Sequence, residues 1–361
     1  MNDRPLGPAI CKEPVRTLAY LQSIGTAVPD TVLEQGDVMD ILAAGRGSPL
    51  PGRMESILAN TGIARRHIAR PVDFYMQPRS WPERAQVYAD TGAALARRAA
   101  NEAMDAAALS PADIDTIVFV STTGTMTPSL PSRLIADMGF SPDTRTVPLF
   151  GYGCAGGVLG LSIASQLTQG GGHTLFLALE LCSLAYDHQR MDKKDIVAAC
   201  LFADGCAAAI LSADRPGAQI GSFAQRVWPK TIDMMGWEIG DTGFDLVLAK
   251  NIPAFVTQEF APMCNAYLAG EGLALSDMGE PACHPGGGRV VDALAAYFVP
   301  DAPDTGAALP ATRAVLRDYG NMSSPTVLFV LQRLLAEQRK KPFLMTALGP
   351  GFTGAIGMVR P

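Results

Sequence analysis

The sequence predicts an α/β fold in two halves, built around a mainly parallel sheet. Short apolar runs rich in β-forming residues alternate with helical stretches along most of the chain, a pattern typical of βαβ units. The pattern starts again near Pro216, where a cluster of Asp, Pro and Gly marks a boundary at 214–218. With 361 residues, 48% of them hydrophobic, the chain is long enough to bury a large core in two such halves.

The first half is predicted to follow an N-terminal extension over residues 1–16 and to span residues 17–215. Its strands are expected at 17–29, 115–123, 144–150, 173–183 and 207–213. Its helices are expected at 53–66, 83–108, 130–138 and 155–169. The helix over 83–108 is rich in Ala, Arg and Glu and contains no helix breaker, so it is expected to be long and continuous.

The second half is predicted to span residues 216–361. Its strands are expected at 218–227, 280–286, 342–351 and 352–359, and its helices at 249–268 and 323–339. No low-complexity linker separates the two halves, so we expect them to share one packed interface.

Composition excludes several classes of protein. The net charge of −6 and the pI near 5.3 do not favour binding to nucleic acid or to an anionic membrane. No apolar stretch approaches the ~18 residues of a membrane span, and the first residues lack the features of a secretion signal. The seven cysteines are an odd number scattered through apolar segments, which indicates free thiols in a reducing cytoplasm.

One cysteine stands at a position suited to nucleophilic catalysis. Cys154 lies in the segment 151–157, GYGCAGG, which follows an expected strand and opens an expected helix. The helix dipole and the free backbone N–H groups there both favour thiolate over thiol. The alternative is a buried structural cysteine beside a tight turn, which is how we interpret the other six.

The same turn also matches a dinucleotide-binding pattern. Gly151, Gly153 and Gly156 form G-x-G-x-x-G between a strand and a helix, and Glu180 ends the next strand, close to the spacing of a ribose-binding acid. The pattern is weak because glycine is common at strand-to-helix turns. This interpretation also gives Cys154 no role.

Two further residues are candidates to act with the cysteine. His284 lies in the segment 282–288, ACHPGGG, at the end of an expected strand, where α/β sheets present catalytic groups. Asn321 lies in 319–324, YGNMSS, just before a helix, where an N-cap role is the alternative. Together with Cys154 they form a nucleophile, base and donor set on three separate turns.

Five segments carry a resemblance to a known family. They are GYGCAGGVLGL (151–161), FADGCAAAIL (202–211), CHPGGGRVVDAL (283–294), VLRDYGNMSSPTVLFVL (315–331) and ALGPGF (347–352). The chain resembles the type III polyketide synthases, the chalcone and stilbene synthase family, from about Thr17 to its end. Its GCAGG and VLRDYGNMSSPTVLFVL forms resemble bacterial members, and most of all the alkylresorcinol and alkylpyrone synthases.

The resemblance implies a thiolase fold, in which two pseudo-equivalent βαβαβαββ halves form a five-layered αβαβα unit. It implies a cytoplasmic homodimer that uses free acyl-CoA and malonyl-CoA, with no acyl carrier protein. It also implies that no metal or redox cofactor takes part.

The resemblance implies catalytic roles for the same three residues. Cys154 is the acyl-accepting nucleophile, and His284 pairs with it and raises its thiolate fraction. His284 and Asn321 then donate hydrogen bonds to the thioester oxygen of malonyl-CoA, which becomes negative when CO2 leaves. The resulting enolate attacks the acyl-Cys thioester and extends the chain by two carbons.

Other positions match residues that shape the product. Thr122, Glu180 and Ser323 coincide with a hydrogen-bonded network that supports aldol closure, which gives Glu180 a second role. Arg53 and Gly286 coincide with CoA-binding positions, whereas Arg65 and Arg66 are interpreted as a solvated helix face.

The cavity positions predict the size of the starter. Phe202 matches the phenylalanine between the CoA tunnel and the cavity, and Leu246 replaces a second gating phenylalanine. Ala185 and Thr127 are expected to be small cavity-lining residues. Smaller side chains leave room for a longer acyl starter.

The sequence thus predicts a type III polyketide synthase with a medium- or long-chain fatty acyl starter and an alkylresorcinol or alkylpyrone product. Three alternatives stay open at this point. One is a ketosynthase III-like enzyme that performs a single condensation on a carrier protein. The second is a nicotinamide-dependent oxidoreductase, and the third is a non-catalytic dimerisation protein of the same fold.

Overall fold

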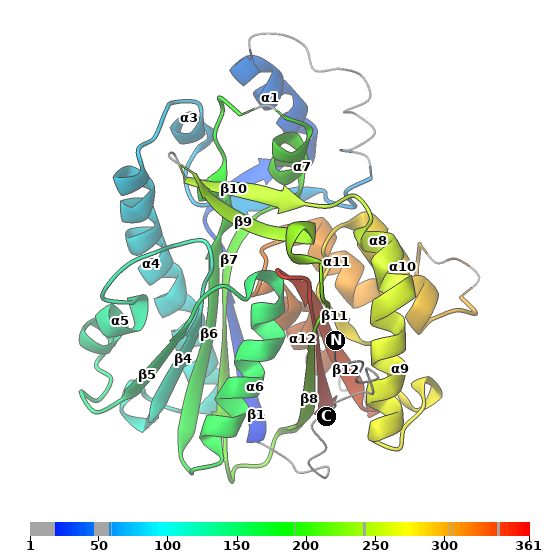
Figure 1. Cartoon of the computed structure of the whole chain (residues 1–361). Coiled ribbons are helices and arrows are strands. Elements are labelled where there is room, and N and C mark those ends of the chain that lie inside the picture. The colour runs from blue at the N-terminus through cyan, green and yellow to red at the C-terminus, as the bar shows by residue number, and fades with distance from the viewer. Residues whose placement is uncertain are drawn as a thin grey trace, which may run out of the picture.

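A nine-stranded sheet runs through both halves of the chain (Figure 1), in the order β11-β12-β13-β8-β1-β7-β6-β4-β5. The computed structural model describes residues 19–46, 58, 60–190, 192–240, 243–302, 304, 306–337 and 340–361. The predicted extension over residues 1–16 and Arg53 lie outside these ranges.

The N-terminal half supplies five strands of this sheet: β1 (Ala19–Ala27), β4 (Thr116–Val120), β5 (Arg145–Leu149), β6 (His173–Leu181) and β7 (Asp204–Ser212). Its helices include α1 (Val38–Arg46), α3 (Val72–Tyr75), α4 (Trp81–Ala107), α5 (Leu130–Met138), α6 (Gly156–Thr168) and α7 (Lys193–Leu201). A separate two-stranded sheet pairs β2 (Thr31–Glu34) with β3 (Arg65–Ile68).

The C-terminal half supplies the other four strands: β8 (Ala218–Val227), β11 (Ala282–Cys283), β12 (Phe343–Gly349) and β13 (Thr353–Arg360). Its α-helices are α8 (Ile252–Phe255), α9 (Ala261–Gly270), α10 (Gly288–Phe298), α11 (Pro310–Tyr319) and α12 (Thr326–Ala336). A second hairpin, β9 (Met235–Gly240) and β10 (Gly243–Leu248), forms its own two-stranded sheet.

The side chains of each strand alternate between two separate cores. On β4, Val118 and Val120 pack in the central core with α6 and α12, whereas Ile117 and Phe119 pack in an outer core with α4 and α5. The strands β12 and β13 divide in the same way between the central core and an outer core that contains α9 and α10. Because strand side chains point alternately to opposite faces, this division makes five layers, αβαβα (Figure 1).

The two halves repeat one strand order. The N-terminal half reads β5-β4-β6-β7-β1, and the C-terminal half reads β11-β12-β13-β8, the same order without a counterpart of β5 among the described residues. The halves join where β1 pairs antiparallel with β8, with Ala19 opposite Ile220. This agrees with the predicted fold of two pseudo-equivalent halves, a thiolase-like α/β architecture.

Two expectations about local structure are wrong. The sheet is mixed, since β1 and β8 run antiparallel to their neighbours, as do the strand pairs β6–β7 and β12–β13 that complete each half. The predicted helix over 53–66 does not extend to Arg65 and Arg66, which belong to β3. Gly62, at φ +74°, turns the chain before them, and pairing with β2 then stabilises the strand.

Most predicted helices are present. The helix over 249–268 is interrupted by a π-helical turn at Val256–Phe260. Five of the described α-helices were not predicted: α1, α3, α7, α10 and α11. The hairpin β9–β10, which lies across the upper part of the sheet in Figure 1, was not predicted either. Within the described part of the chain, no helix is both long and apolar enough to cross a membrane.

Candidate active site

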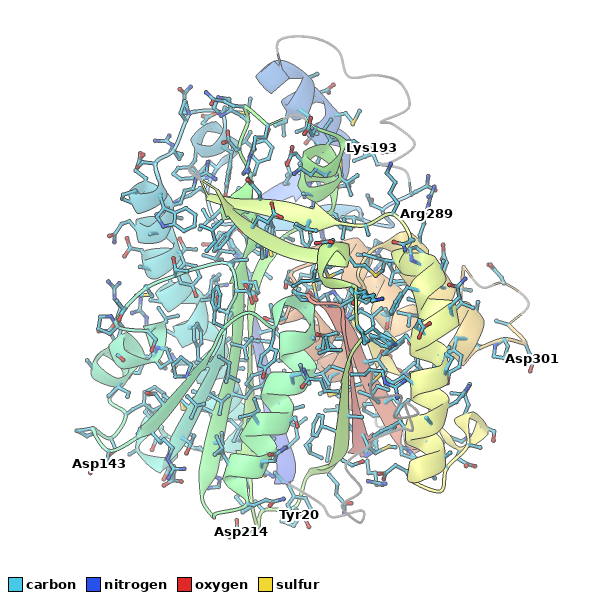
Figure 2. The ribbon with its side chains drawn as sticks, in the orientation of Figure 1. Tyr20, Asp143, Lys193, Asp214, Arg289 and Asp301 are labelled. Carbon is cyan, nitrogen blue, oxygen red and sulfur yellow. The ribbon has the colours of Figure 1, made fainter. Side chains whose placement is uncertain are left out.

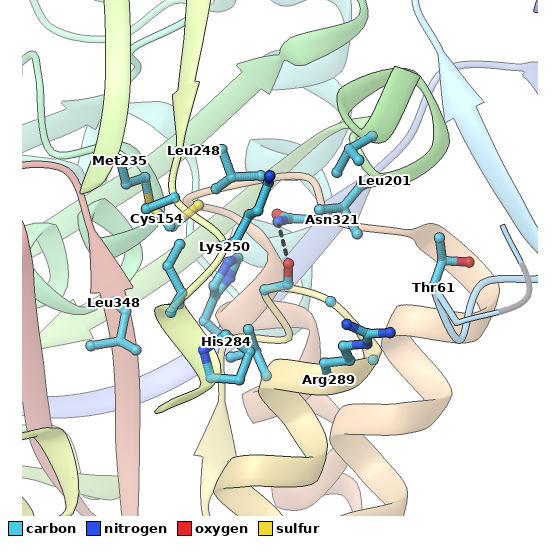
Figure 3. A pocket seen from close by; sticks show the side chains of 18 of the residues that line it. Thr61, Cys154, Leu201, Met235, Leu248, Lys250, His284, Arg289, Asn321 and Leu348 are labelled. Carbon is cyan, nitrogen blue, oxygen red and sulfur yellow. Dashed lines mark hydrogen bonds between the residues drawn. The ribbon is translucent and has the colours of Figure 1, made fainter. Parts of the chain in front are cut away.

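A cavity of about 730 Å³ brings the three predicted catalytic residues together (Figure 3). Cys154 comes from the short 3-10 turn Gly153–Ala155 that leads into α6, and His284 follows β11. Asn321 lies between α11 and α12, where its backbone forms a bridge to Phe202. Thus three distant segments converge on one cavity.

The turn that carries Cys154 is tightly packed and needs glycine. Gly153 has φ +48°, and a Cβ there would lie 2.7 Å from the Pro350 ring. The N–H of Gly153 donates to Oγ1 of Thr122 at 3.0 Å. These contacts fix the turn, and with it the direction of the Cys154 side chain.

Cys154 is buried, and its environment favours the neutral thiol. Its side chain is 6% exposed, and Sγ donates to Oγ of Ser323 at 3.5 Å. Burial raises the pKa of Cys154 to about 12, although the Ser323 bond lowers it. Burial of the thiol therefore opposes the thiolate that the helix N-terminus was expected to favour.

His284 is buried and electrically neutral at neutral pH. Its backbone N–H donates to the Thr346 carbonyl at 2.7 Å, which holds the residue at the end of β11. Burial lowers the pKa of His284 to about 3, and neither ring nitrogen has a hydrogen-bond partner among the described residues. The expected pairing with Cys154 is thus not formed. A neutral imidazole keeps one acceptor and one donor nitrogen for substrate and thiol.

The amide of Asn321 is oriented by its neighbour. Its Oδ1 accepts the N–H of Ser323 at 2.8 Å, so the NH2 group faces the cavity, where it contacts the Gly286 carbonyl at 3.4 Å (Figure 3). The helix α12 begins later, with Pro325 as its N-cap, so the alternative role as an N-cap does not apply to Asn321. Asn321 therefore presents a donor to the cavity.

Glu180 lies behind the cavity in a different network from the one expected. Its oxygens accept the N–H groups of Thr122 and Thr123, at 2.9–3.1 Å, and the hydroxyls of Thr123 and Ser324 at 2.7 and 3.1 Å. Ser323, which was expected in this network, contacts Cys154 instead. Burial raises the pKa of Glu180 to about 7. The carboxylate is fully buried, so it does not fit the ribose-binding acid of the dinucleotide alternative.

A second, smaller cavity of about 90 Å³ lies beyond Phe202, whose side chain lines both cavities. Ala185 and Leu246 line this second chamber, as predicted from their cavity positions. Thr127 does not, because it is exposed and lines neither cavity. Trp237 stands beside Phe202, with 6.1 Å between ring centroids.

The mouth of the larger cavity carries positive charge that the sequence analysis missed. Four exposed cations line it: Lys193, Lys194, Lys250 and Arg289. Lys193 and Arg289 lie at the same end of the molecule in Figure 2, in the first turns of α7 and α10. Helix N-termini and cations together attract phosphate groups. Gly286 lines the same cavity, whereas Arg53 lies outside the described residues.

Two signals in the sequence were available but unused. The adjacent pair Lys193–Lys194 opens a helix, and Ser324 directly follows the serine that was chosen for the Glu180 network. Among the residues that the structure describes, no three His, Cys, Asp or Glu side chains lie close enough together to hold a metal ion.

Comparison with known proteins identifies the family. The family model "Chalcone and stilbene synthases, N-terminal domain" matches residues 11–215, and the corresponding C-terminal model matches residues 219–358. A 1,3,6,8-tetrahydroxynaphthalene synthase from Streptomyces peucetius subsp. caesius is 33% identical, over 94% of this chain and 92% of the relative. A 3,5-dihydroxyphenylacetyl-CoA synthase from Amycolatopsis orientalis is 30% identical, over 93% and 92%.

The fold agrees with this similarity. The crystal structure of the 1,3,6,8-tetrahydroxynaphthalene synthase from Streptomyces coelicolor A3(2), a bacterial type III polyketide synthase, superposes with a TM-score of 0.88. It is 29% identical and the match covers 95% of this chain and 99% of that one. The chain therefore belongs to the chalcone and stilbene synthase family and is a type III polyketide synthase, an acyltransferase with the thiolase fold.

Proposed function

We propose that Cys154 carries the growing chain and that His284 and Asn321 activate both substrates. The observation that supports this most is the convergence of the three side chains on one cavity. In the loading step, His284 accepts the proton of the Cys154 thiol as the sulfur bonds to the thioester carbonyl of the acyl-CoA, so the pairing absent at rest forms only with substrate bound. The C–S bond to CoA breaks, and the CoA thiolate leaves with the proton held by His284.

In the extension step, the same two donors act on malonyl-CoA. The Nδ2 group of Asn321 and an N–H of His284 bind the thioester oxygen of the malonyl group. When CO2 leaves, this oxygen becomes an enolate, which the two donors stabilise. The enolate carbon then attacks the acyl-Cys154 carbonyl, a C–C bond forms, and the Cys154 thiolate is released for the next cycle.

The cations at the mouth fit the phosphates of the CoA carrier. Lys193, Lys194, Lys250 and Arg289 line the open end of the cavity, and Cys154 lies inside it. This arrangement supports binding of CoA with its phosphates outside and its thioester at Cys154. Arg53 remains a further candidate from the sequence.

We assign a medium- or long-chain fatty acyl starter, with an alkylresorcinol or alkylpyrone as product. Support comes from the second chamber, where Leu246 and Ala185 leave apolar space beyond Phe202. Burial of each methylene contributes up to ~0.8 kcal/mol, so an apolar chamber selects for chain length.

A second candidate is favoured by the relatives. The compound in the name of the two Streptomyces relatives, 1,3,6,8-tetrahydroxynaphthalene, has no alkyl tail. By analogy, this chain would make a hydroxylated aromatic without an alkyl tail, and so without a fatty acyl starter.

Mass spectrometry of products separates the two candidates. The enzyme is given malonyl-CoA alone, and then malonyl-CoA with acyl-CoA starters of increasing length. Alkylated products that require the fatty starter support the first candidate, and an efficient product from malonyl-CoA alone supports the second. Intact-protein mass spectrometry should show an acyl adduct that disappears in Cys154→Ala and persists in the matched control Cys264→Ala, which removes a buried thiol outside both cavities. An adduct on Cys154→Ala would contradict the nucleophile assignment.

We also propose that the enzyme is a homodimer. The strand β5 lies at an edge of the sheet, and Phe150 directly after it is 59% exposed. An open strand edge with an exposed aromatic side chain favours pairing with a second copy. Light scattering should give a two-chain mass for the wild type and a one-chain mass for Phe150→Asp.

A further inference from the structure

Two of the segments that line the second chamber belong to different parts of the fold, and α1, β3, α3 and α7 also contribute to the lining. On one side is the hairpin β9–β10, which contributes Trp237, Phe244 and Leu246. On the other side is the turn at Ala185–Asp187, at the end of the 3-10 helix that follows β6. Because β9 and β10 pair only with each other in the described sheets, other contacts must hold the hairpin against the N-terminal half.

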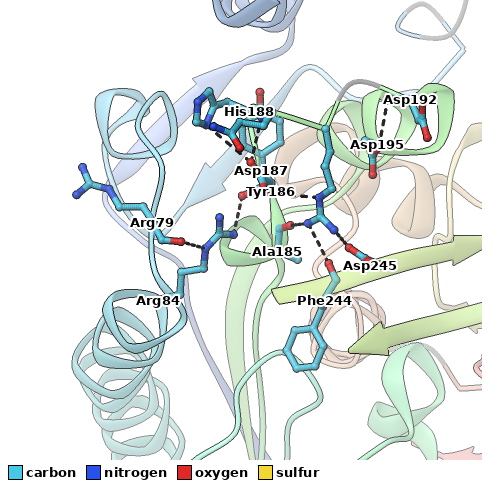
Figure 4. Close-up of polar contacts among 12 residues, drawn as sticks. Arg79, Arg84, Ala185, Tyr186, Asp187, His188, Asp192, Asp195, Phe244 and Asp245 are labelled. Carbon is cyan, nitrogen blue, oxygen red and sulfur yellow. Dashed lines mark hydrogen bonds and ion pairs between the residues drawn. The ribbon is translucent and has the colours of Figure 1, made fainter. Parts of the chain in front are cut away.

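Arg190 connects these two walls (Figure 4). Its Nη2 donates to the carbonyl of Ala185 at 3.1 Å and to the carbonyl of Phe244 at 3.2 Å. Its Nη1 forms an ion pair with Asp245 on β10, and its Nε lies 3.8 Å from a carboxylate oxygen of Asp187. We call Arg190 with these four partners the Arg190 clamp.

The hydrogen bonds of Arg190 to the two carbonyls contribute more to the clamp than its ion pair with Asp245. The side chains of Arg190 and Asp245 are 25% and 34% exposed, and ion pairs at that exposure contribute little by themselves. The planar guanidinium, however, holds one main-chain carbonyl from each wall at the same time. This fixes the spacing between the two walls.

A row of aromatic rings extends from the clamp to the partition between the cavities. The carbonyl of Phe244 is bound by the clamp, and the ring centroid of Phe244 lies 5.9 Å from that of Trp237. The ring centroids of Trp237 and Phe202 are 6.1 Å apart. The ring of Trp81 on α4 also packs edge-to-face against the ring of Phe244, with 5.2 Å between ring centroids. A shift of β10 would therefore move the chamber wall and the residues beside Phe202 together.

Two of the four charged residues that line the chamber, Asp187 and Arg190, belong to the clamp, and the other two are Arg66 and Asp195. Leu246 and Ala185, by contrast, line its apolar part. An alkyl chain that reached the charged groups would separate them from water and from one another, which is unfavourable.

We propose that the Arg190 clamp sets the longest acyl chain that the second chamber accepts, with Arg190 as a positioning residue for chain-length specificity. This inference rests on the proposed fatty acyl starter for its effect on products. Its mechanical part, the attachment of the hairpin, is independent of the starter.

The first measurement is the chain-length profile of kcat/KM with saturated acyl-CoA starters. In Arg190→Gln the optimum should move to longer chains by about two carbons or more, since the wall yields and further methylenes are buried. Asp245→Asn should shift it less, because both carbonyl contacts remain, and Arg190→Lys should restore the profile only in part. The control is Arg97→Gln, which breaks an exposed Arg–Asp pair with Asp137 away from both cavities and should leave the profile unchanged.

The second measurement is amide hydrogen exchange of residues 235–248 in the same proteins. In the Arg190→Gln variant the amide hydrogens of residues 235–248 should exchange roughly tenfold faster than in the wild type. Exchange in the central strands should not change. Unchanged exchange would overturn the clamp whatever the starter is. Faster exchange with an unchanged chain-length profile would overturn its role in specificity. A wild type that extends no fatty acyl-CoA would contradict the proposed starter, and the exchange data would still decide whether the clamp exists.

Discussion

Ser323 links two of the three proposed catalytic residues. Its N–H holds the amide of Asn321, and its hydroxyl accepts the hydrogen bond of the Cys154 thiol. The residue has φ +60°, a left-handed conformation that is uncommon for non-glycine residues and costs ~1–3 kcal/mol. The structure tolerates this strain where it positions the nucleophile and the donor together.

Asn321→Asp should remove the donor while keeping the bond that orients it. Aspartate retains an oxygen for the N–H of Ser323 but presents a negative charge to the enolate. Decarboxylation of malonyl-CoA, measured as CO2 release, should fall by about 100-fold or more, the scale of losing one oxyanion donor. The control is Asn265→Asp, an exposed asparagine that contacts Tyr297. A wild-type rate in Asn321→Asp would rule out the donor role.

Ser323→Ala should make Cys154 less reactive. The hydroxyl bond lowers the pKa of the thiol, so its loss raises that pKa and reduces the thiolate fraction at any pH below it. Alkylation of Cys154 by iodoacetamide at pH 8 should slow by roughly threefold to tenfold, as expected for the loss of one hydrogen bond. Ser324→Ala is the matched control, since that hydroxyl contacts Glu180. Equal rates in the two variants would show that Ser323 does not tune the thiol.

For single residues, the sequence indicated which side chains belong to the site better than it indicated their burial and hydrogen bonds. Residue types at predicted turns made Cys154, His284 and Asn321 candidates, and the resemblance to the type III polyketide synthases then gave them catalytic roles. The protonation of Cys154 was not predictable, because local sequence shows a helix N-terminus but not the burial contributed by other segments. The sequence pattern does not show which of the adjacent hydroxyls, Ser323 or Ser324, points to Glu180, and in the structure Ser324 contacts Glu180 while Ser323 contacts Cys154.

The helix α6 connects the nucleophile to the donor loop through a close glycine contact. A Cβ at Gly157 would lie 2.3 Å from the Ser324 carbonyl and 2.5 Å from Val327. Gly157 thus lets the helix that follows Cys154 approach the segment that carries Asn321.

Gly157→Ala should therefore separate α6 from α12 and lower both stability and activity. We expect a loss of ~1–3 kcal/mol in the free energy of unfolding, the usual cost of overpacking a core, measured by urea denaturation. Gly170→Ala is the control, because a Cβ there meets only the Leu167 carbonyl at 3.7 Å. Equal stability of the two variants would contradict the tight contact.

Elements were predictable where burial gave a clear pattern. The buried strands β4, β6 and β7 were found because both of their faces are apolar, and the helix α4 was found because it is rich in Ala, Arg and Glu. The hairpin β9–β10 was missed because its strands form a cavity wall, and their mixed composition reflects that role. The prediction of a mainly parallel sheet was wrong because an apolar run does not show whether the neighbouring strand is parallel or antiparallel to it.

At the scale of the whole molecule, buried ionisable groups make stability depend on pH. Burial raises the pKa of Glu180 and of Asp204 to about 7 each and lowers that of His284 to about 3. The two carboxyls bind protons more tightly in the folded state, so their contribution is complete below the unfolded pKa values and is lost as pH rises to 7. The histidine acts in the opposite direction, and its contribution is lost as pH falls from 6.5 towards 3.

Glu180→Gln isolates one of these contributions. Between pH 4.5 and 7 the wild type should lose stability relative to this variant by up to about 3 kcal/mol, because the variant has no proton to release there. The measurement is the free energy of unfolding by urea at several pH values, taken as the difference between the two proteins so that all other titrations cancel. Asp143→Asn removes an exposed carboxyl, so its free energy of unfolding should change with pH as that of the wild type does over the same range. If the difference for Glu180→Gln is also flat, Glu180 keeps an ordinary pKa, and the hydrogen bonds from Thr122, Thr123 and Ser324 outweigh its burial.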